Sequence, residues 1–255
     1  SSPPQNVETA AQSGPRKLYV TRGTSPDPGA TFSRIAMALS KANPGDTIVL
    51  LDDRYEDWLV IGGKMKSQLK DLVIEGGLPN RKTVWAAPAT GHVRAILEIQ
   101  GLENLTVRGI SFEASGRADA CISVAGTTGD LTLEDLTLRG ATAAPLLISS
   151  SSTPDHPLVI QNVRAIADQG ALAAVMLTSR AKVPVSHVRL IDNRIEGQAA
   201  QVGIQLDGPM NGIEIRHNRI YNTSTAVQIS GTFDGSDPYL VHFVRNTVHT
   251  VADAG

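Results

Sequence analysis

The sequence predicts an all-β solenoid, a parallel β-helix in which short strands stack coil upon coil. Two observations predict it. First, one eight-residue skeleton of alternating apolar residues recurs along most of the chain. Second, successive recurrences start 25 to 33 residues apart, with further short apolar runs and no helical pattern between them. A repeat of this size cannot bury its own apolar face, so neighbouring repeats must stack to build the core.

The segment before the repeats is expected to cap the solenoid. Residues 1–16 are polar, without the apolar run of a signal peptide, and are expected to form a linker. Residues 32–42 place apolar side chains at helical spacing, which predicts a short amphipathic helix with Thr31 as its N-cap and Asn43 beginning the stop signal. Three apolar runs are expected strands: 17–20, 47–51 and 57–62.

The repeats align as seven segments without gaps. They begin at Leu72, Leu105, Leu131, Leu158, Val188, Ile213 and Val241. Secondary strands are expected between them at 121–124, 145–148, 174–177, 203–206 and 226–229. At about 4.8 Å per coil, the seven coils should rise about 30 Å. One domain is therefore expected over residues 17–255. Because its last coil is unfinished and has no capping element, we expect either that the natural chain continues beyond it or that a partner chain covers this end.

The stretch AMALSKANPGDTIVLLDDRYEDWLVI, residues 36–61, and the Asn-containing coils that follow carry a family resemblance. They resemble the N-terminal cap and coils of right-handed parallel β-helix proteins of the pectin-lyase-like superfamily, over about residues 17–255. The resemblance implies a right-handed parallel β-helix and a location outside the cytoplasm: secreted, periplasmic or at the cell surface. This superfamily includes lyases, hydrolases, epimerases, adhesins and inert modules, so it leaves the activity open.

Composition excludes several other classes. The net charge is −2, which gives no bulk attraction for nucleic acid. No apolar run approaches the 18 residues of a membrane span. The single cysteine, Cys121, excludes an intramolecular disulfide and a multi-cysteine metal site. The histidines lack metal-ligand spacing, and Asp192, Asp207 and Glu214 fall in different columns. No cofactor is therefore expected, and calcium is the only metal left open.

Alignment turns the repeats into columns of stacked residues. Asn193, Asn218 and Asn246 share a column at a bend, where we expect their amides to bond to one another and to the backbone rather than to a ligand. An outward column begins with Glu75, Arg108 and Glu134 and continues to Arg216, which we interpret as a solvated face with alternating charges.

The candidate site is a second outward column, in which Arg164, Arg194 and Arg219 stack in successive coils. Like charges opposed in a sheet are unfavourable. Either the arginines are solvated and partly neutralised by Glu196, or they bind an anion, for which the guanidinium group is well suited. Tyr221 lies in the column of Glu196 and can offer a stacking surface to a sugar ring. The candidate carbohydrate-binding residues are Arg164, Arg194, Arg219, Glu196, Tyr221, His217 and Asp192.

His217 lies between Asp192 and Arg245 in a third outward column, where it can serve as an acid or base or be only a neighbour. No complete set of catalytic residues is visible, and the outward columns hold no adjacent Asp pair of the kind that glycoside hydrolases use. The function predicted first is a non-catalytic or carbohydrate-binding module of a larger extracytoplasmic protein, in contact with an acidic polysaccharide or another glycan. The alternatives are a polysaccharide lyase or epimerase acting on polyuronate, a glycoside hydrolase whose acids come from loops, and an adhesin-like structural rod.

Overall fold

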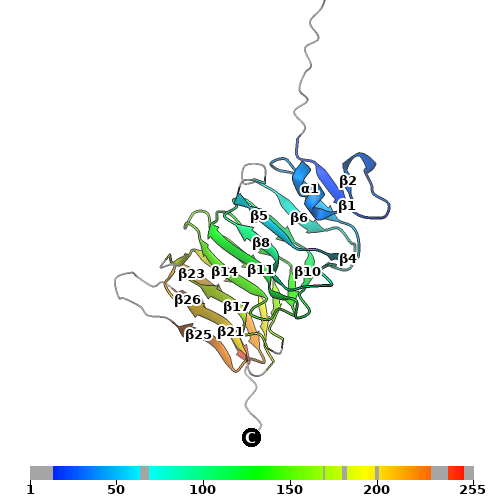
Figure 1. Ribbon diagram of the computed structural model, residues 1–255. Coiled ribbons are helices and arrows are strands. Elements are labelled where there is room, and N and C mark those ends of the chain that lie inside the picture. The colour runs from blue at the N-terminus through cyan, green and yellow to red at the C-terminus, as the bar shows by residue number, and fades with distance from the viewer. Residues whose placement is uncertain are drawn as a thin grey trace, which may run out of the picture.

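The protein is a right-handed parallel β-helix whose coils pass through three sheets in turn (Figure 1). The computed structural model describes residues 14–63, 69–168, 170–179, 183–198, 201–230 and 241–249. Neighbouring coils are joined by parallel strand pairing, for example Ile160 with Leu133 and with Leu190. The fold class predicted from the repeat is therefore confirmed.

The three sheets run the length of the solenoid. Sheet A contains, in spatial order, β2 (Thr31–Phe32), β1 (Lys17–Val20), β3 (Thr47–Leu50), β6 (Val73–Gly76), β9 (Thr106–Arg108), β12 (Thr132–Glu134), β15 (Leu158–Gln161), β19 (Val188–Ile191), β23 (Ile213–Arg216) and β26 (Val241–Val244). Sheet B contains β4 (Arg54–Glu56), β7 (Thr83–Ala86), β10 (Ile110–Glu113), β13 (Thr137–Arg139), β16 (Arg164–Ile166), β20 (Arg194–Glu196), β24 (Arg219–Tyr221) and β27 (Thr247–His249). Sheet C contains β5 (Leu59–Gly62), β8 (Val93–Gln100), β11 (Ala118–Thr127), β14 (Leu146–Ser151), β17 (Ala173–Thr178), β21 (Val202–Asp207) and β25 (Thr225–Ser230), with β18 (Val185–Ser186) and β22 (Met210–Asn211) beside it.

The core of sheet A follows two apolar columns of the alignment, which begin at Leu72 and at Ile74 and point inward. Leu133 is fully buried, and it pairs with Val107 on one side and Ile160 on the other. The same column ends at Phe243 in β26, whose side chain is 45% exposed. Each inward side chain is covered by the coils above and below it, so burial fades in the last described coil.

The first repeat departs from the gapless alignment. Thr83 of β7, not Gly77, pairs with Ile110, so the bend between β6 and β7 is longer than in the later coils. A side chain at Gly77 would place its Cβ 2.5 Å from Val49, so this bend packs directly on the preceding coil. Strand β8 was also missed. Its residues 95–97 are all buried, which hides the period-2 alternation that marks the other strands.

The capping helix is shorter than predicted. Helix α1 spans Ile35–Lys41, and Thr31 and Phe32 instead form β2, which pairs with β1. The expectation that Thr31 caps the helix is therefore wrong, because pairing with β1 uses its backbone in extended form. Arg34 holds the N-cap position and makes no side-chain cap. The helix still closes one end of the core, against which it buries Ile35, Ala38 and Leu39. A single 3₁₀ turn, η1 (Pro28–Ala30), precedes β2.

An ion pair fastens the start of the described chain. Arg16 donates its backbone N–H to Asp46 Oδ1 at 2.9 Å, and its Nη2 lies 2.7 Å from Oδ2. Burial alone would raise the pKa of Asp46, but the hydrogen bonds from Arg16 and from the Asn43 backbone outweigh it and lower that pKa. Most of the predicted linker, 1–16, lies outside the described residues. The last residue of the linker, Arg16, is thus fixed to the first coil.

The predicted asparagine ladder is confirmed. Asn193 Nδ2 donates to Asn218 Oδ1 at 2.9 Å, and Asn218 Nδ2 donates to Asn246 Oδ1 at 3.0 Å. The backbone N–H groups of Asn193 and Asn218 also donate to the amide oxygen of the next coil. The buried amides therefore satisfy both one another and the backbone of the bend, and they have a structural role.

A candidate anion site on the outer face of sheet A

The predicted arginine column exists, and one carboxylate, Glu196, balances part of its charge. Arg164 pairs with Arg194, and Arg194 with Arg219, in neighbouring strands of sheet B. Arg164 donates two hydrogen bonds of 2.9 Å to the two oxygens of Glu196, and Arg194 Nε also donates to this carboxylate. Partial burial raises the pKa of Glu196, but the bonds and charges of the two arginines outweigh it and lower that pKa. The geometry favours the Glu-paired explanation for Arg164 and Arg194.

Tyr221 is covered from both neighbouring strands. The guanidinium carbon of Arg194 lies 5.4 Å from the centroid of the Tyr221 ring. The ring of His249 stacks on it from the next coil, with centroids 5.2 Å apart and planes 3° apart. A sugar ring would have to displace one of these neighbours. Arg219 is exposed and has no carboxylate within ion-pair distance in the described part of the chain. Glycan binding by this column stays a prediction.

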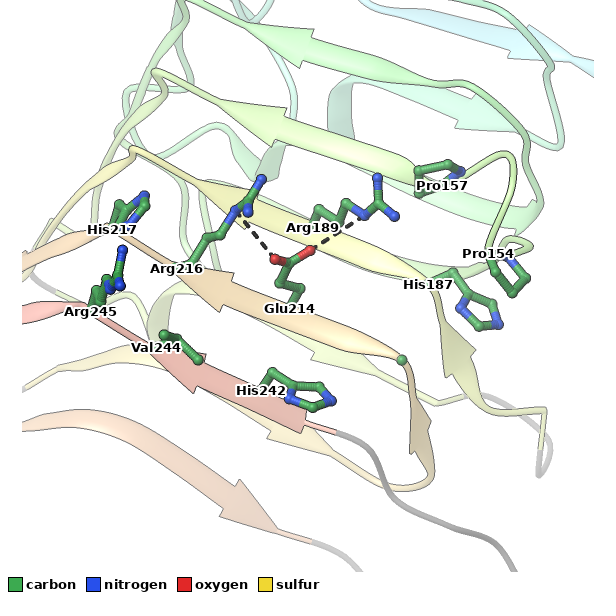
Figure 2. A pocket seen from close by; sticks show the side chains of 11 residues that line it. Pro154, Pro157, His187, Arg189, Glu214, Arg216, His217, His242, Val244 and Arg245 are labelled. Atoms are coloured by element: carbon green, nitrogen blue, oxygen red, sulfur yellow. Dashed lines mark ion pairs between the residues drawn. The ribbon is translucent and has the colours of Figure 1, made fainter.

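A different surface holds the same ratio of three arginines to one carboxylate, but around a hollow. A hollow of about 510 Å³ lies on the outer face of sheet A, over β19, β23 and β26 (Figure 2). We call it the basic hollow. It is lined by Pro154, Pro157, His187, Arg189, Gly212, Glu214, Arg216, His217, His242, Val244 and Arg245. Three arginines and three histidines thus share this surface with a single carboxylate.

Glu214 lies between two of these arginines. Arg189 Nε is 3.4 Å from Glu214 Oε2, and Arg216 Nε is 3.2 Å from Glu214 Oε1 (Figure 2). Arg245 at the bend after β26 has no acidic partner among the described residues. His217, at the equivalent bend one coil earlier, lies 3.8 Å from Asp192. Of the predicted site residues, His217 therefore lines the basic hollow and Asp192 lies beside it.

The strand alternation and the bends position these side chains. Arg189 pairs with Glu214, and Glu214 with His242, so the three stand in one outward column. His217 and Arg245 adopt positive φ angles of 55° and 54° at the bends into sheet B. Such left-handed residues turn the chain sharply, and they bring both side chains to the edge of the hollow.

Gly212 makes room for His187 at the opposite end of the basic hollow. A Cβ at Gly212 would lie 2.5 Å from His187 Nδ1, and Gly212 has a φ of 63°. Any other residue here would therefore both strain the backbone and push the imidazole away.

Sequence reasoning missed this site because it interpreted the column of Arg216 as a solvated face of alternating charges. The signal was in the neighbouring column, where Arg189 and His242 flank a single acid. The lining prolines could not be found from columns at all, because Pro154 and Pro157 belong to a loop between coils.

Other chemistries find no support in the described residues. No group of three or more His, Cys, Asp or Glu side chains there is arranged to hold a metal ion, so calcium gains no support. Burial raises the pKa of the Cys121 thiol to about 12, which removes it as a nucleophile at neutral pH. Where the chain is described, no helix combines the length and the apolar character that crossing a bilayer requires.

Comparison with solved structures shows the fold. Pectate lyase Pel9A superimposes with a TM-score of 0.56 at 14% identity, over 90% of this chain and 58% of the lyase. The Dettilon tailspike protein matches with a TM-score of 0.49 at 14% identity, over 80% of this chain and 43% of its own. A pectin methylesterase in complex with hexasaccharide VII gives 0.42 at 12% identity, over 93% of both chains. The chain thus spans little more than half of the lyase.

No family model matches the sequence, and no curated protein does. The protein therefore has the fold of the pectin-lyase-like superfamily, the right-handed parallel β-helix, as the resemblance in its sequence implied.

Proposed function

We propose that this β-helix is a carbohydrate-binding module of an extracytoplasmic protein, and that it binds an acidic polysaccharide in the basic hollow. One observation carries the proposal: three guanidinium groups line the hollow with one carboxylate between them. Guanidinium groups bind carboxylates and sulfates through paired, charge-assisted hydrogen bonds. A glycan with anionic groups on successive sugars would supply the missing negative charge.

The size and the local charge of the hollow support this ligand class. Its volume of about 510 Å³ falls in the usual range for small-ligand sites. The whole chain carries a net charge of −2, so attraction for an anion must come from local surfaces such as this one. Screening by salt should therefore weaken binding strongly.

A binding role fits the hollow better than the alternative of a lyase or epimerase. Proton abstraction needs a base whose lone pair can reach the substrate. The single carboxylate of the lining, Glu214, lies between Arg189 and Arg216 instead, which leaves only the histidines of the lining as candidate bases. Resemblance to a pectate lyase is an analogy of fold and does not supply a mechanism. The enzymatic alternative stays a prediction, as does the structural rod.

Titration calorimetry with polygalacturonate, alginate and a sulfated glycan tests the proposal, with neutral dextran as the comparison. We expect binding to the acidic glycans at low salt, and its loss at high salt. Arg216→Ala combined with Arg245→Ala should weaken binding at least about tenfold, since two charged contacts are removed.

The matched control is Arg108→Ala. Arg108 occupies the same outward column as Arg216 but contacts Glu75 and Glu134, so its loss should leave glycan binding unchanged. Absence of binding to every acidic glycan at low salt would contradict the proposal. If the double variant binds like the wild type, the hollow is not the site. Ultraviolet absorbance of the mixtures reports unsaturated product and so tests the lyase alternative.

A further inference from the structure

The contacts of Glu214 differ from those of the other paired acids. The shortest contacts from Arg189 and Arg216 to Glu214 run from Nε, at 3.4 and 3.2 Å, and among the described residues neither arginine makes a hydrogen bond to it. By contrast, Glu196 accepts two bonds of 2.9 Å from the fork of a single arginine, Arg164. Within the described residues, the terminal nitrogens of Arg189 and Arg216 make no hydrogen bond. The two guanidinium groups therefore keep most of their donors available to another anion.

We propose that Glu214 is a built-in competitor for the anionic group of the ligand. It occupies the position between Arg189 and Arg216 in the free protein, and a ligand anion takes over the contacts to these arginines when it binds. This inference rests on the proposed function of the same hollow. Glu214 is 31% exposed in its side chain, so it can swing away from the arginines without unpacking the core.

Competition by a tethered group selects the class of ligand. A group held by a short flexible tether acts at an effective concentration in the millimolar range or above. A single carboxylate on a monosaccharide cannot compete well against it. An oligosaccharide with several anions also reaches Arg245 and His242, which line the same hollow. The ligand is therefore an oligosaccharide with anionic groups on neighbouring sugars, and an isolated uronic acid is rejected.

Glu214→Gln tests the inference because it removes the competing charge and keeps the shape. We expect the variant to bind trigalacturonate about fivefold more tightly than the wild type, the upper range for an exposed charge pair. Binding of galacturonate monomer should become measurable. Glu214→Ala should change the affinity in the same direction. Adding Arg216→Ala to Glu214→Gln should return the affinity to the wild-type value or below it.

Glu134→Gln is the matched control, because it removes one negative charge from the same sheet beside Arg108. It should leave both affinities unchanged, and melting temperatures check that every variant is folded. If Glu214→Gln binds trigalacturonate as the wild type does, or more weakly, Glu214 is not a competitor and the inference fails. If instead the wild type binds no acidic glycan at all, the proposed function fails. The two failures are thus distinguishable.

Discussion

The two halves of the outer face of sheet A carry opposite charge arrangements on the same scaffold. In the N-terminal half, Arg108 lies between two acids, with Nη2 2.6 Å from Glu75 Oε2 and Nη1 3.7 Å from Glu134 Oε1. In the C-terminal half, Glu214 lies between Arg189 and Arg216. The N-terminal half thus places one cation between two anions, and the C-terminal half places one anion between two cations.

The comparison shows which positions the fold leaves free. Inward residues of both halves are apolar or part of a satisfied amide ladder, because each must pack against the coils above and below. Outward residues only have to avoid strong repulsion, so their charges can differ from coil to coil. A binding surface can therefore be confined to a few coils of an otherwise uniform solenoid.

Sheet B shows no such reversal. In its N-terminal half, Glu113 accepts contacts from Arg54 and Arg139. In its C-terminal half, Glu196 accepts contacts from Arg164 and Arg194. The same arrangement of one partly buried acid with two exposed arginines is used twice, which supports a structural role for both.

The halves also differ inside, at the bend between sheets A and B. The column that holds Ile110, Leu136 and Val163 in the first half holds asparagines in the second. Of the changes considered, we expect removal of one of these asparagines to have the largest effect, and that effect is on stability. Asn218→Ala removes the oxygen that accepts two hydrogen bonds from Asn193, and it leaves the backbone N–H of Asn193 unpaired. This loss should lower the free energy of unfolding by about 1–3 kcal/mol.

Chemical denaturation measures that cost. The control is Arg219→Ala, an exposed neighbour on the following strand, for which a change within about 0.5 kcal/mol is expected. Equal stabilities of the two variants would show that the amide ladder contributes nothing beyond filling space.

A smaller effect, on glycan affinity, is expected when the N-terminal half of sheet A loses the acids that distinguish it from the C-terminal half. Glu75→Gln combined with Glu134→Gln leaves Arg108 without its two acids. The N-terminal half should then bind polygalacturonate weakly and in a salt-sensitive way, with an affinity a few-fold above that of the same protein with both acids. The gain is small because one guanidinium offers fewer donors than the three of the basic hollow.

The gain is measured in the background of Arg216→Ala and Arg245→Ala, where the basic hollow no longer contributes. No gain there would mean that charge balance alone does not make a site, and that the shape of the hollow is needed as well.

The smallest effects are expected on sheet B, where the halves are alike. Contacts with arginines outweigh the effect of partial burial and lower the pKa values of both Glu113 and Glu196. A lowered pKa in the folded state stabilises the protein above the unfolded value of about 4.3, and the stabilisation disappears as pH falls through the folded-state pKa.

Glu113→Gln and Glu196→Gln should therefore each cost up to about 1 kcal/mol near pH 7, since the partner arginines are exposed. The difference from the wild type should close as the pH falls below the unfolded value of about 4.3 and through the lowered folded-state pKa. Melting temperatures across this range check the expectation. A cost that persists unchanged at low pH would show that lost packing, not the ion pairs, is responsible.

The sequence by itself determined the stacking. A nearly constant skeleton fixes which residues lie above one another, because parallel strands add at a single spacing and each side chain meets its equivalent in the next coil. The core columns, the asparagine ladder and the alignment of Arg164, Arg194 and Arg219 all followed from it.

Only the tertiary structure decided the elements that break the repeat. Pairing with β1 turned the predicted start of the helix into β2, and the longer bend between β6 and β7 makes Thr83, not Gly77, the partner of Ile110. It also decided how the exposed charges pair. Side chains of one column reach across to another, as Glu196 does to Arg164, and the loop prolines complete the basic hollow from outside the strands. Such contacts depend on rotamers and on loops of unequal length, which the spacing of a repeat does not encode.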